Sequence, residues 1–169
     1  MLEYLRAHRR AFDLLAAGAC GLLLAYAFYL QFRHGLDPCP LCIFQRVAVF
    51  ALGVALLLAA APPAAWRAAR VVTTMLVALA ALAGAGVAGR HLYIQSLPPD
   101  KVPVCGASLD YMMDVFPLGQ VLRKVLTGSG ECAKVDWTFL GLSMPGWVLI
   151  WVVLLGTFGV LVNWPRRRG

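Results

Sequence analysis

Four cysteines of this sequence have spacings that could support thiol–disulfide chemistry. Cys39 and Cys42 form a Cys-x-x-Cys pair within DPCPLCIFQR, and Cys105 and Cys132 lie further along the chain. Thiols exchange with disulfides through a mixed disulfide, and disulfides persist in oxidising compartments. The spacing also allows two purely structural disulfides, Cys39–Cys42 and Cys105–Cys132, or a zinc site with four thiolates.

The surroundings of Cys39 and Cys42 favour a reactive pair. A Cys-x-x-Cys disulfide closes a very short loop, so it adds little stability by restricting the unfolded chain. Cys42 directly precedes an apolar run, and the N-terminus of a helix there would favour its thiolate. Arg46 lies four residues later, on the same helix face. A cation at this depth needs a partner, a thiolate or a polar ligand, unless it snorkels to the surface.

Two further residues deserve comparison with this pair. His91 ends the third apolar run and could bind a ligand between the helix ends, although a histidine there is also common as an interfacial residue. Cys20 lies inside an apolar run and is expected to be a small core or lipid-facing residue.

Four long apolar runs are the elements that must position these residues. The chain is 61% hydrophobic and 14% charged, whereas soluble domains have about 25% charged residues. Each run has roughly the 20 residues that a bilayer requires, which predicts an all-α, antiparallel four-transmembrane-helix bundle rather than a very apolar soluble bundle. The first run is expected to be retained and not cleaved as a signal peptide. The predicted spans are 11–32, 43–61, 71–89 and 145–164.

The basic residues predict how this single domain, residues 1–169, is oriented. Arginines cluster before the first run, between the second and third, and after the fourth. The positive-inside rule then places both termini in the cytoplasm of a bacterial inner-membrane protein, with the loops 33–42 and 90–144 in the periplasm. Because the arginines orient the chain in the lipid bilayer, nucleic-acid binding is not expected.

The long periplasmic loop contains an amphipathic stretch. In DVFPLGQVLRKVLTG, residues 114–128, apolar side chains recur at helical spacing. A short helix in the outer membrane interface is predicted, with packing on the top of the bundle as the alternative. Pro117 and Gly119 argue against one continuous helix.

The destination of electrons taken up by such cysteines can be narrowed by elimination. Electrons must leave the cysteines if the protein is to turn over. The sequence has no haem-attachment motif, dinucleotide-binding glycine pattern or iron–sulfur spacing. A lipid-soluble quinone near Cys42 and Arg46 is the remaining acceptor.

These motifs together resemble the DsbB family over nearly the whole chain. The resemblance rests on CPLCIFQR followed by a span, the Cys105 and Cys132 pair, and WTFLGLSMPGW before the last span. It implies a protein-dithiol:quinone oxidoreductase that reoxidises periplasmic DsbA and reduces ubiquinone or menaquinone. DsbA, DsbB and quinone are already established as the system that keeps the periplasm oxidising. One departure is Gln45, where some members of the family carry an acidic residue.

The resemblance also implies a role for each site residue. Cys105 would form the mixed disulfide with DsbA, and the released Cys132 would attack Cys39. Cys42 would then face the quinone, with Arg46 and, less securely aligned, His91 beside it. No resident metal is implied. The competing hypothesis is a non-enzymatic four-span scaffold held by two structural disulfides.

Overall fold

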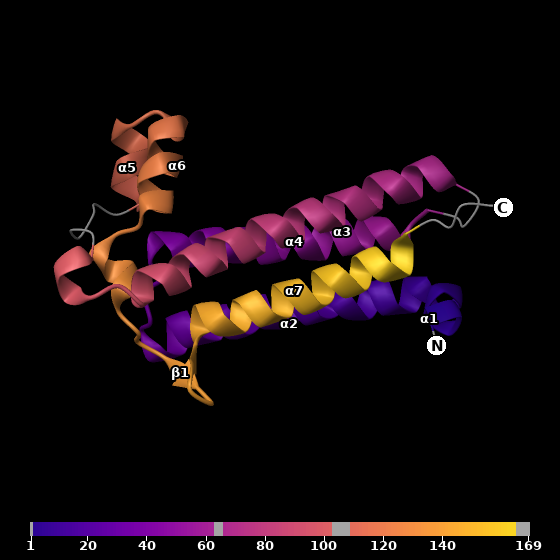
Figure 1. The fold of residues 1–169 in the computed structure, drawn as a ribbon, viewed down its shortest axis with the longest axis horizontal. Helices are drawn as coiled ribbons and strands as arrows, with labels where there is room; N and C mark the ends of the chain where they lie inside the picture. The colour runs from indigo at the N-terminus through magenta and orange to yellow at the C-terminus, as the bar shows by residue number, and fades with distance from the viewer. Residues whose placement is uncertain (1, 63–65, 103–108, 165–169) are drawn as a thin grey trace.

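The computed structural model describes residues 2–62, 66–102 and 109–164. Four long helices lie side by side along one axis (Figure 1), and each is long and apolar enough to cross a membrane. They are α2 (Arg9–His34), α3 (Pro40–Ala60), α4 (Arg67–Gln95) and α7 (Met144–Asn163). The N-terminus and the end of α7 lie at one end of the bundle (Figure 1), as an even number of spans requires. The predicted four-helix membrane bundle is confirmed.

Two helix boundaries differ from the predicted spans. Helix α3 begins at Pro40, three residues earlier than predicted, because Cys39 caps it and Pro40 suits the first helical turn. Helix α4 continues to Gln95 instead of ending at 89, since no proline follows before Pro98. Cys42 and His91 therefore lie within helices rather than in the loops at their ends.

The core of the bundle depends on small residues that let the helices approach closely. Helix α4 packs against α3 and α7, and α2 packs against α3. A Cβ at Gly156 would collide with Ala81, and one at Gly159 would lie 2.8 Å from Leu56. Small residues at such crossings are typical of helix packing in membranes, where van der Waals contact drives association. Larger buried side chains fill the rest of the core: Val49, Leu52, Leu56, Val77 and Val152.

The predicted amphipathic helix is present, but it is interrupted. Helix α5 (Leu109–Val115) ends before Pro117, which caps α6 (Leu118–Thr127), and both run across the bundle axis (Figure 1). Val121 and Val125 are buried with residues at the end of the bundle, whereas Leu118 is 76% exposed. The alternative prediction, packing on the top of the bundle, is therefore correct for the helix face that carries the two valines. The face that carries Leu118 is exposed.

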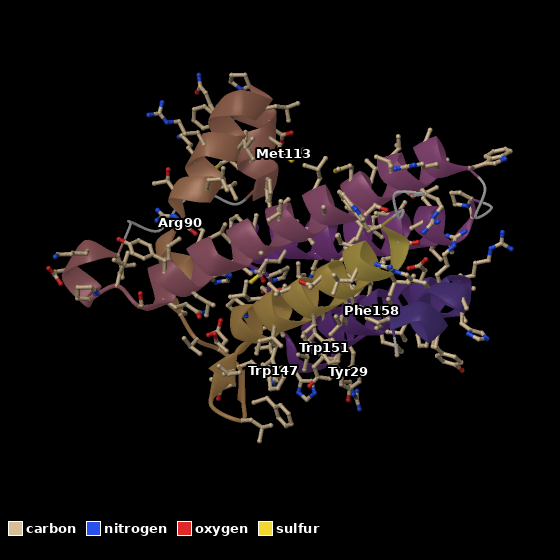
Figure 2. The ribbon with its side chains drawn as sticks, turned by 45° about the vertical axis from the view of Figure 1, so that its right-hand side comes forward. Tyr29, Arg90, Met113, Trp147, Trp151 and Phe158 are labelled. Carbon is tan, nitrogen blue, oxygen red and sulfur yellow. The ribbon has the colours of Figure 1, made fainter. Side chains whose placement is uncertain are left out.

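Arg90 holds α6 against the end of the bundle. Its guanidinium donates hydrogen bonds to the carbonyls of Leu126 and Thr127, each at 2.9 Å. These are terminal carbonyls of α6, which lack partners inside the helix and favour a cation. Figure 2 shows Arg90 pointing from α4 toward this helix. This contact at the end of α6 therefore fixes the segment that leads to Cys132 against helix α4.

Short elements complete the end of the bundle opposite the termini. A 3₁₀ turn, η1 (Pro99–Lys101), follows α4, and a second, η2 (Gly130–Ala133), follows α6. Strands β1 (Thr138–Phe139) and β2 (Leu142–Ser143) form an antiparallel hairpin. Its two turn residues, Leu140 and Gly141, have φ angles of +50° and +78°, as in the two-residue turns that suit hairpins. Helix α1 (Leu2–Ala7), which comes before α2 in the chain, lies at the opposite end of the bundle, beside the N-terminus.

Candidate functional site

The Cys-x-x-Cys pair is built into the N-terminus of α3. Cys39 is the N-cap residue, and its sulfur accepts a hydrogen bond from the backbone N–H of Cys42 at 3.3 Å. The cap leaves both sulfurs in the first turn, where unpaired backbone N–H groups favour negative charge. The sequence thus places both thiols, and not Cys42 alone, at the positive end of the helix.

The two sulfurs are close but not bonded in this structure. Cys39 and Cys42 are free thiols with their Sγ atoms 3.0 Å apart, whereas a disulfide bond is about 2.05 Å long. The predicted Cys39–Cys42 disulfide is therefore not formed here. It stays a prediction for the oxidised protein, which needs only a small side-chain movement.

The η2 turn brings Cys132 onto this pair. Cys132 is 1% exposed, and its sulfur, the Cys39 sulfur and a ring nitrogen of His91 all lie within 4.8 Å of one another. A hydrogen bond with Cys39, together with burial, raises the pKa of the Cys132 thiol. The predicted approach of Cys132 to Cys39 is therefore present in the geometry. Cys105, and with it the predicted Cys105–Cys132 disulfide, lies outside the described residues.

His91 stands among the sulfurs with both ring nitrogens engaged. The side chain is 2% exposed. Nε2 lies 3.0 Å from the Cys132 carbonyl oxygen and 3.9 Å from the Cys39 sulfur, and Nδ1 lies 3.1 Å from Nε2 of Gln45. A carbonyl accepts only from an N–H, so Nε2 carries the proton and Nδ1 accepts from the Gln45 amide. The predicted contact of His91 with quinone stays a prediction.

Gln45 is the site residue that sequence reasoning did not assign. It is 3% exposed, on α3 beside Arg46, and its amide fixes the imidazole of His91 on α4. The signal that could have found it is a polar residue three positions, or about five-sixths of a turn, after Cys42, in a helix that is otherwise apolar apart from Arg46.

Arg46 is bound to α2 rather than free at the surface. Its guanidinium donates to the Gln31 side-chain oxygen and, at 3.2 Å, to the Ala27 carbonyl. The same group stacks over the Phe28 ring, 4.9 Å from the ring centre. These partners offset the cost of holding a cation inside the end of a span. The geometry therefore disagrees with snorkelling and keeps a fixed positive charge one turn below Cys42.

Two pockets meet at Cys42 and Arg46. One has a volume of about 450 Å³ and is lined mainly by apolar and aromatic residues of α2, α3 and α7. The other, of about 360 Å³, is lined by Asp37, Cys39, His91 and Glu131 among others. Cys42 and Arg46 contribute to both linings. Cys42 therefore borders both an apolar pocket and a second pocket that contains charged and polar side chains.

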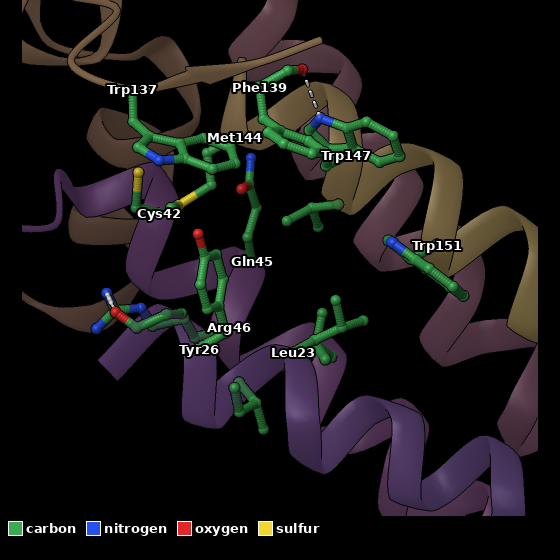
Figure 3. Close-up of a pocket in the computed structure, with 14 residues that line it drawn as sticks. Leu23, Tyr26, Cys42, Gln45, Arg46, Trp137, Phe139, Met144, Trp147 and Trp151 are labelled. Atoms are coloured by element: carbon green, nitrogen blue, oxygen red, sulfur yellow. Dashed lines mark hydrogen bonds between the residues drawn. The ribbon is translucent and has the colours of Figure 1, made fainter. Parts of the chain in front are cut away.

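The β hairpin supplies an aromatic wall for the apolar pocket. Trp137 meets Tyr26 of α2 edge to face at 6.1 Å and stacks with Phe139. The indole N–H of Trp147 donates to the Phe139 carbonyl at 3.0 Å, which ties the hairpin to α7. Figure 3 shows Trp137 and Met144 beside Cys42, with Trp147 and Trp151 further along the pocket. The hairpin and the residue before it thus form one wall of the apolar pocket.

A four-helix membrane bundle with three thiols and a histidine at one end defines a class of membrane proteins that handle thiol–disulfide chemistry. The family model described as disulfide bond formation protein DsbB matches residues 9–162, and the chain belongs to the DsbB family of disulfide bond formation proteins. Curated relatives agree with this assignment and share most of their length with the chain.

Three such relatives carry the name disulfide bond formation protein B. The protein from Methylococcus capsulatus is 50% identical over 149 residues, covering 88% of this chain and 90% of its own. The one from Nitrosococcus oceani is 49% identical, with 88% and 86% covered. The one from Chromobacterium violaceum is 46% identical, with 92% and 93% covered. The chain is thus a multi-pass membrane protein of disulfide bond formation.

Proposed function

We propose that this protein reoxidises a periplasmic DsbA-type dithiol protein and passes the electrons to a membrane quinone. The observation that carries the proposal is the position of Cys42 in the linings of both pockets. The polar pocket suits exchange between cysteines, and the apolar pocket suits a lipid-soluble acceptor. As a protein-dithiol:quinone oxidoreductase, the chain would generate disulfides rather than only hold them.

The cysteine steps follow from the distances around Cys39. Reduced partner would form a mixed disulfide with Cys105, which releases Cys132 as a thiolate. Cys132 would attack Cys39, so a Cys39–Cys132 bond forms, the Cys39–Cys42 bond breaks and Cys42 leaves as a thiolate. The Cys39 and Cys132 sulfurs lie within 4.8 Å, so this attack needs little movement of the protein.

His91 and Arg46 support the two charges that this sequence creates. Nε2 of His91 lies 3.9 Å from the Cys39 sulfur, where an N–H can stabilise negative charge during the exchange. The Arg46 guanidinium, held on α2, is the fixed cation closest in sequence to the Cys42 thiolate. Neither group needs to change partners while Cys42 becomes negative, which is the arrangement that electrostatic preorganisation favours.

The apolar pocket fits a quinone by its size and its donor set. Pockets for small molecules commonly have about 300–1,000 Å³ and a few polar groups among apolar side chains. This one combines aromatic rings with the Gln45 amide and the Arg46 guanidinium. Ubiquinone or menaquinone, when bound there, would take up two electrons and two protons and leave as quinol. Cys42, Gln45 and Arg46 are the residues that would hold its ring.

The proposed location is the bacterial inner membrane, with the cysteine-bearing end in the periplasm. The bundle places the cysteine site and the chain termini at opposite ends (Figure 1). Arg9, Arg10, Arg67 and Arg70 lie at the terminal end, which the positive-inside rule assigns to the cytoplasm. Four cysteines would then be in an oxidising compartment.

Coupled turnover tests the proposal. Purified protein in detergent, given a reduced DsbA-type protein and a soluble quinone, should consume the quinone, as followed by its absorbance. Cys42→Ser should reduce the rate to background, and the core variant Cys20→Ala should keep it. Normal quinone consumption by Cys42→Ser would contradict the proposal. Arg46→Ala should raise the quinone KM, and an unchanged KM would remove Arg46 from the quinone site.

A further inference from the structure

The three groups gathered around Cys39 have the composition of a soft-metal site. Two thiols and one imidazole, from Cys39, Cys132 and His91, have their ligand atoms within 4.8 Å of one another. Zinc bonds of about 2.3 Å to sulfur and 2.0–2.1 Å to nitrogen separate two tetrahedral ligands by about 3.5–3.8 Å. The Cys39 sulfur and His91 Nε2 are 3.9 Å apart. Even two ligand atoms at the 4.8 Å limit would have to approach each other by only about 1 Å to reach the spacing of zinc ligands.

The imidazole also has the supporting partner that a metal-bound histidine needs. A ligating histidine usually donates its second ring N–H to a neighbouring acceptor, which fixes the ring. Gln45, 3% exposed, lies 3.1 Å from Nδ1 of His91. Its amide offers both an N–H donor and a carbonyl acceptor, so a rotated amide could accept a hydrogen bond from the N–H of Nδ1. Nε2 would then exchange its hydrogen bond with the Cys132 carbonyl for a bond to the metal.

We propose that the reduced protein binds a thiophilic cation, with Zn²⁺ as the representative, through Cys39, His91 and Cys132. Thiolate and imidazole ligands select ions such as Zn²⁺ and Cu⁺, whereas Mg²⁺ and Ca²⁺ prefer oxygen. The Cys42 sulfur, 3.0 Å from that of Cys39, is near enough to supply a fourth ligand. Binding through Cys39 and Cys132 releases two thiol protons, ligation by Cys42 releases a third, and no electrons are transferred.

This site exists only while the cysteines are reduced. Any disulfide that includes Cys39 or Cys132 removes a thiolate ligand, so oxidation would release the metal. The further consequence rests on the proposed function: an occupied site would hold Cys132 and Cys39 as metal ligands and stop their exchange. Zinc would then inhibit the reduced enzyme and have little effect on the oxidised one.

Cobalt titration of the reduced full-length protein in detergent tests the site directly. Under anaerobic conditions, Co²⁺ should bind at one equivalent, with a thiolate-to-metal charge-transfer band and visible bands of tetrahedral Co²⁺. Zn²⁺ should displace it. We expect Cys132→Ser to lose at least half of the charge-transfer intensity, and His91→Ala to bind Co²⁺ at least tenfold more weakly. His91→Gln, which keeps a polar side chain, guards against misfolding and should also bind more weakly.

Two matched controls should keep the wild-type spectrum. Cys20→Ala removes a cysteine from the bundle core, and Cys105→Ala removes the fourth cysteine of the relay, which the proposed site does not use. No charge-transfer band in the wild type would overturn the inference. An unchanged band in both His91→Ala and Cys132→Ser would also overturn it, since Cys39 and Cys42 alone would then hold the metal.

Turnover separates this inference from the proposed function. Zn²⁺ added to reduced protein before quinone should slow quinone consumption, and a chelator should restore it. Cobalt binding by a protein that never consumes quinone would support the metal site and contradict the proposed function. Quinone consumption by a protein that shows no cobalt band would support the proposed function and contradict the metal site.

Discussion

The two ends of the bundle both bury polar groups, but they hold them in opposite ways. At the cysteine end, the thiols make hydrogen bonds through sulfur, and Cys39 and Cys42 contribute to the linings of pockets. At the terminal end, Arg9, Asp13, Asn163 and Arg70 form a cluster that is bonded largely to backbone carbonyls. Groups that must exchange partners are held by weak sulfur contacts, whereas the groups that fix the helices are held mainly by hydrogen bonds to backbone carbonyls, with Oδ2 of Asp13 and Nε of Arg70 left without a partner among the described residues.

The terminal cluster connects all four long helices. Asn163 of α7 donates to Asp13 of α2 at 2.7 Å. Arg9, also on α2, donates to the Ala59 carbonyl of α3 at 3.0 Å, and Arg70 of α4 donates to the Asn163 carbonyl at 3.0 Å. Asp13 and Asn163 are at most 1% exposed. Since lipid offers no alternative partners, these bonds keep the helix ends in register.

The largest effect is expected from substitutions at Cys39, which can separate its role in turnover from its role in helix stability. Because the Cys39 sulfur caps α3, Cys39→Ser keeps a good N-cap acceptor but removes the redox atom. We expect turnover at background and an unchanged melting temperature. Cys39→Ala should lose turnover and also about 1 kcal/mol of stability. Equal stability in the two variants, measured by thermal unfolding in detergent, would contradict the capping role.

The next effect should appear at the other end and spare the chemistry. Asn163→Leu leaves the buried Asp13 carboxylate without its donor, which should cost roughly 2–4 kcal/mol of stability. The folded fraction should keep its kcat. Thr73→Val is the matched control, since the Thr73 hydroxyl bonds only carbonyls of its own helix. A kcat that falls together with stability would show that the two ends are coupled.

A smaller effect concerns pH at the cysteine end. In the fully reduced protein, a hydrogen bond with Cys39 and burial raise the pKa of the Cys132 thiol, so little of it is thiolate at neutral pH. A raised thiol pKa means that the thiolate fraction increases about tenfold per pH unit below that pKa. Reaction of Cys132 in the fully reduced protein with a small disulfide reagent, stopped by acid at successive times and measured between pH 6 and 8, should accelerate accordingly. A flat profile would mean that loss of the Cys132 proton does not limit the attack.

The smallest effect should come from the aromatic wall. Trp147→Phe keeps a ring in the apolar pocket but removes the hydrogen bond to the Phe139 carbonyl. Losing about 1 kcal/mol should raise the quinone KM roughly fivefold. Trp164→Phe, at the opposite end of α7, is the control and should leave KM unchanged. An equal KM in the two variants would remove the hairpin from the acceptor site.

The sequence predicts the architecture better than it predicts the site. Apolar run length and arginine placement are enough for four spans, because the bilayer imposes both. The hairpin was not predicted, because strands of two residues are too short to show an alternating apolar and polar pattern. Gln45 escaped because its partner, His91, lies on another helix, and such contacts depend on helix rotation. Arg46 was expected beside Cys42, but its partners on α2 required the packed bundle.

A single-turnover count of thiols and quinone tests the central claim most directly, namely that electrons pass from the cysteines through Cys42 to an acceptor in the apolar pocket. Fully reduced protein is mixed anaerobically with one equivalent of quinone, and free thiols and quinol are then measured. The account predicts two thiols lost for each quinol formed, and neither change in Cys42→Ser. Thiol loss without quinol, or quinol formation by Cys42→Ser, would contradict it.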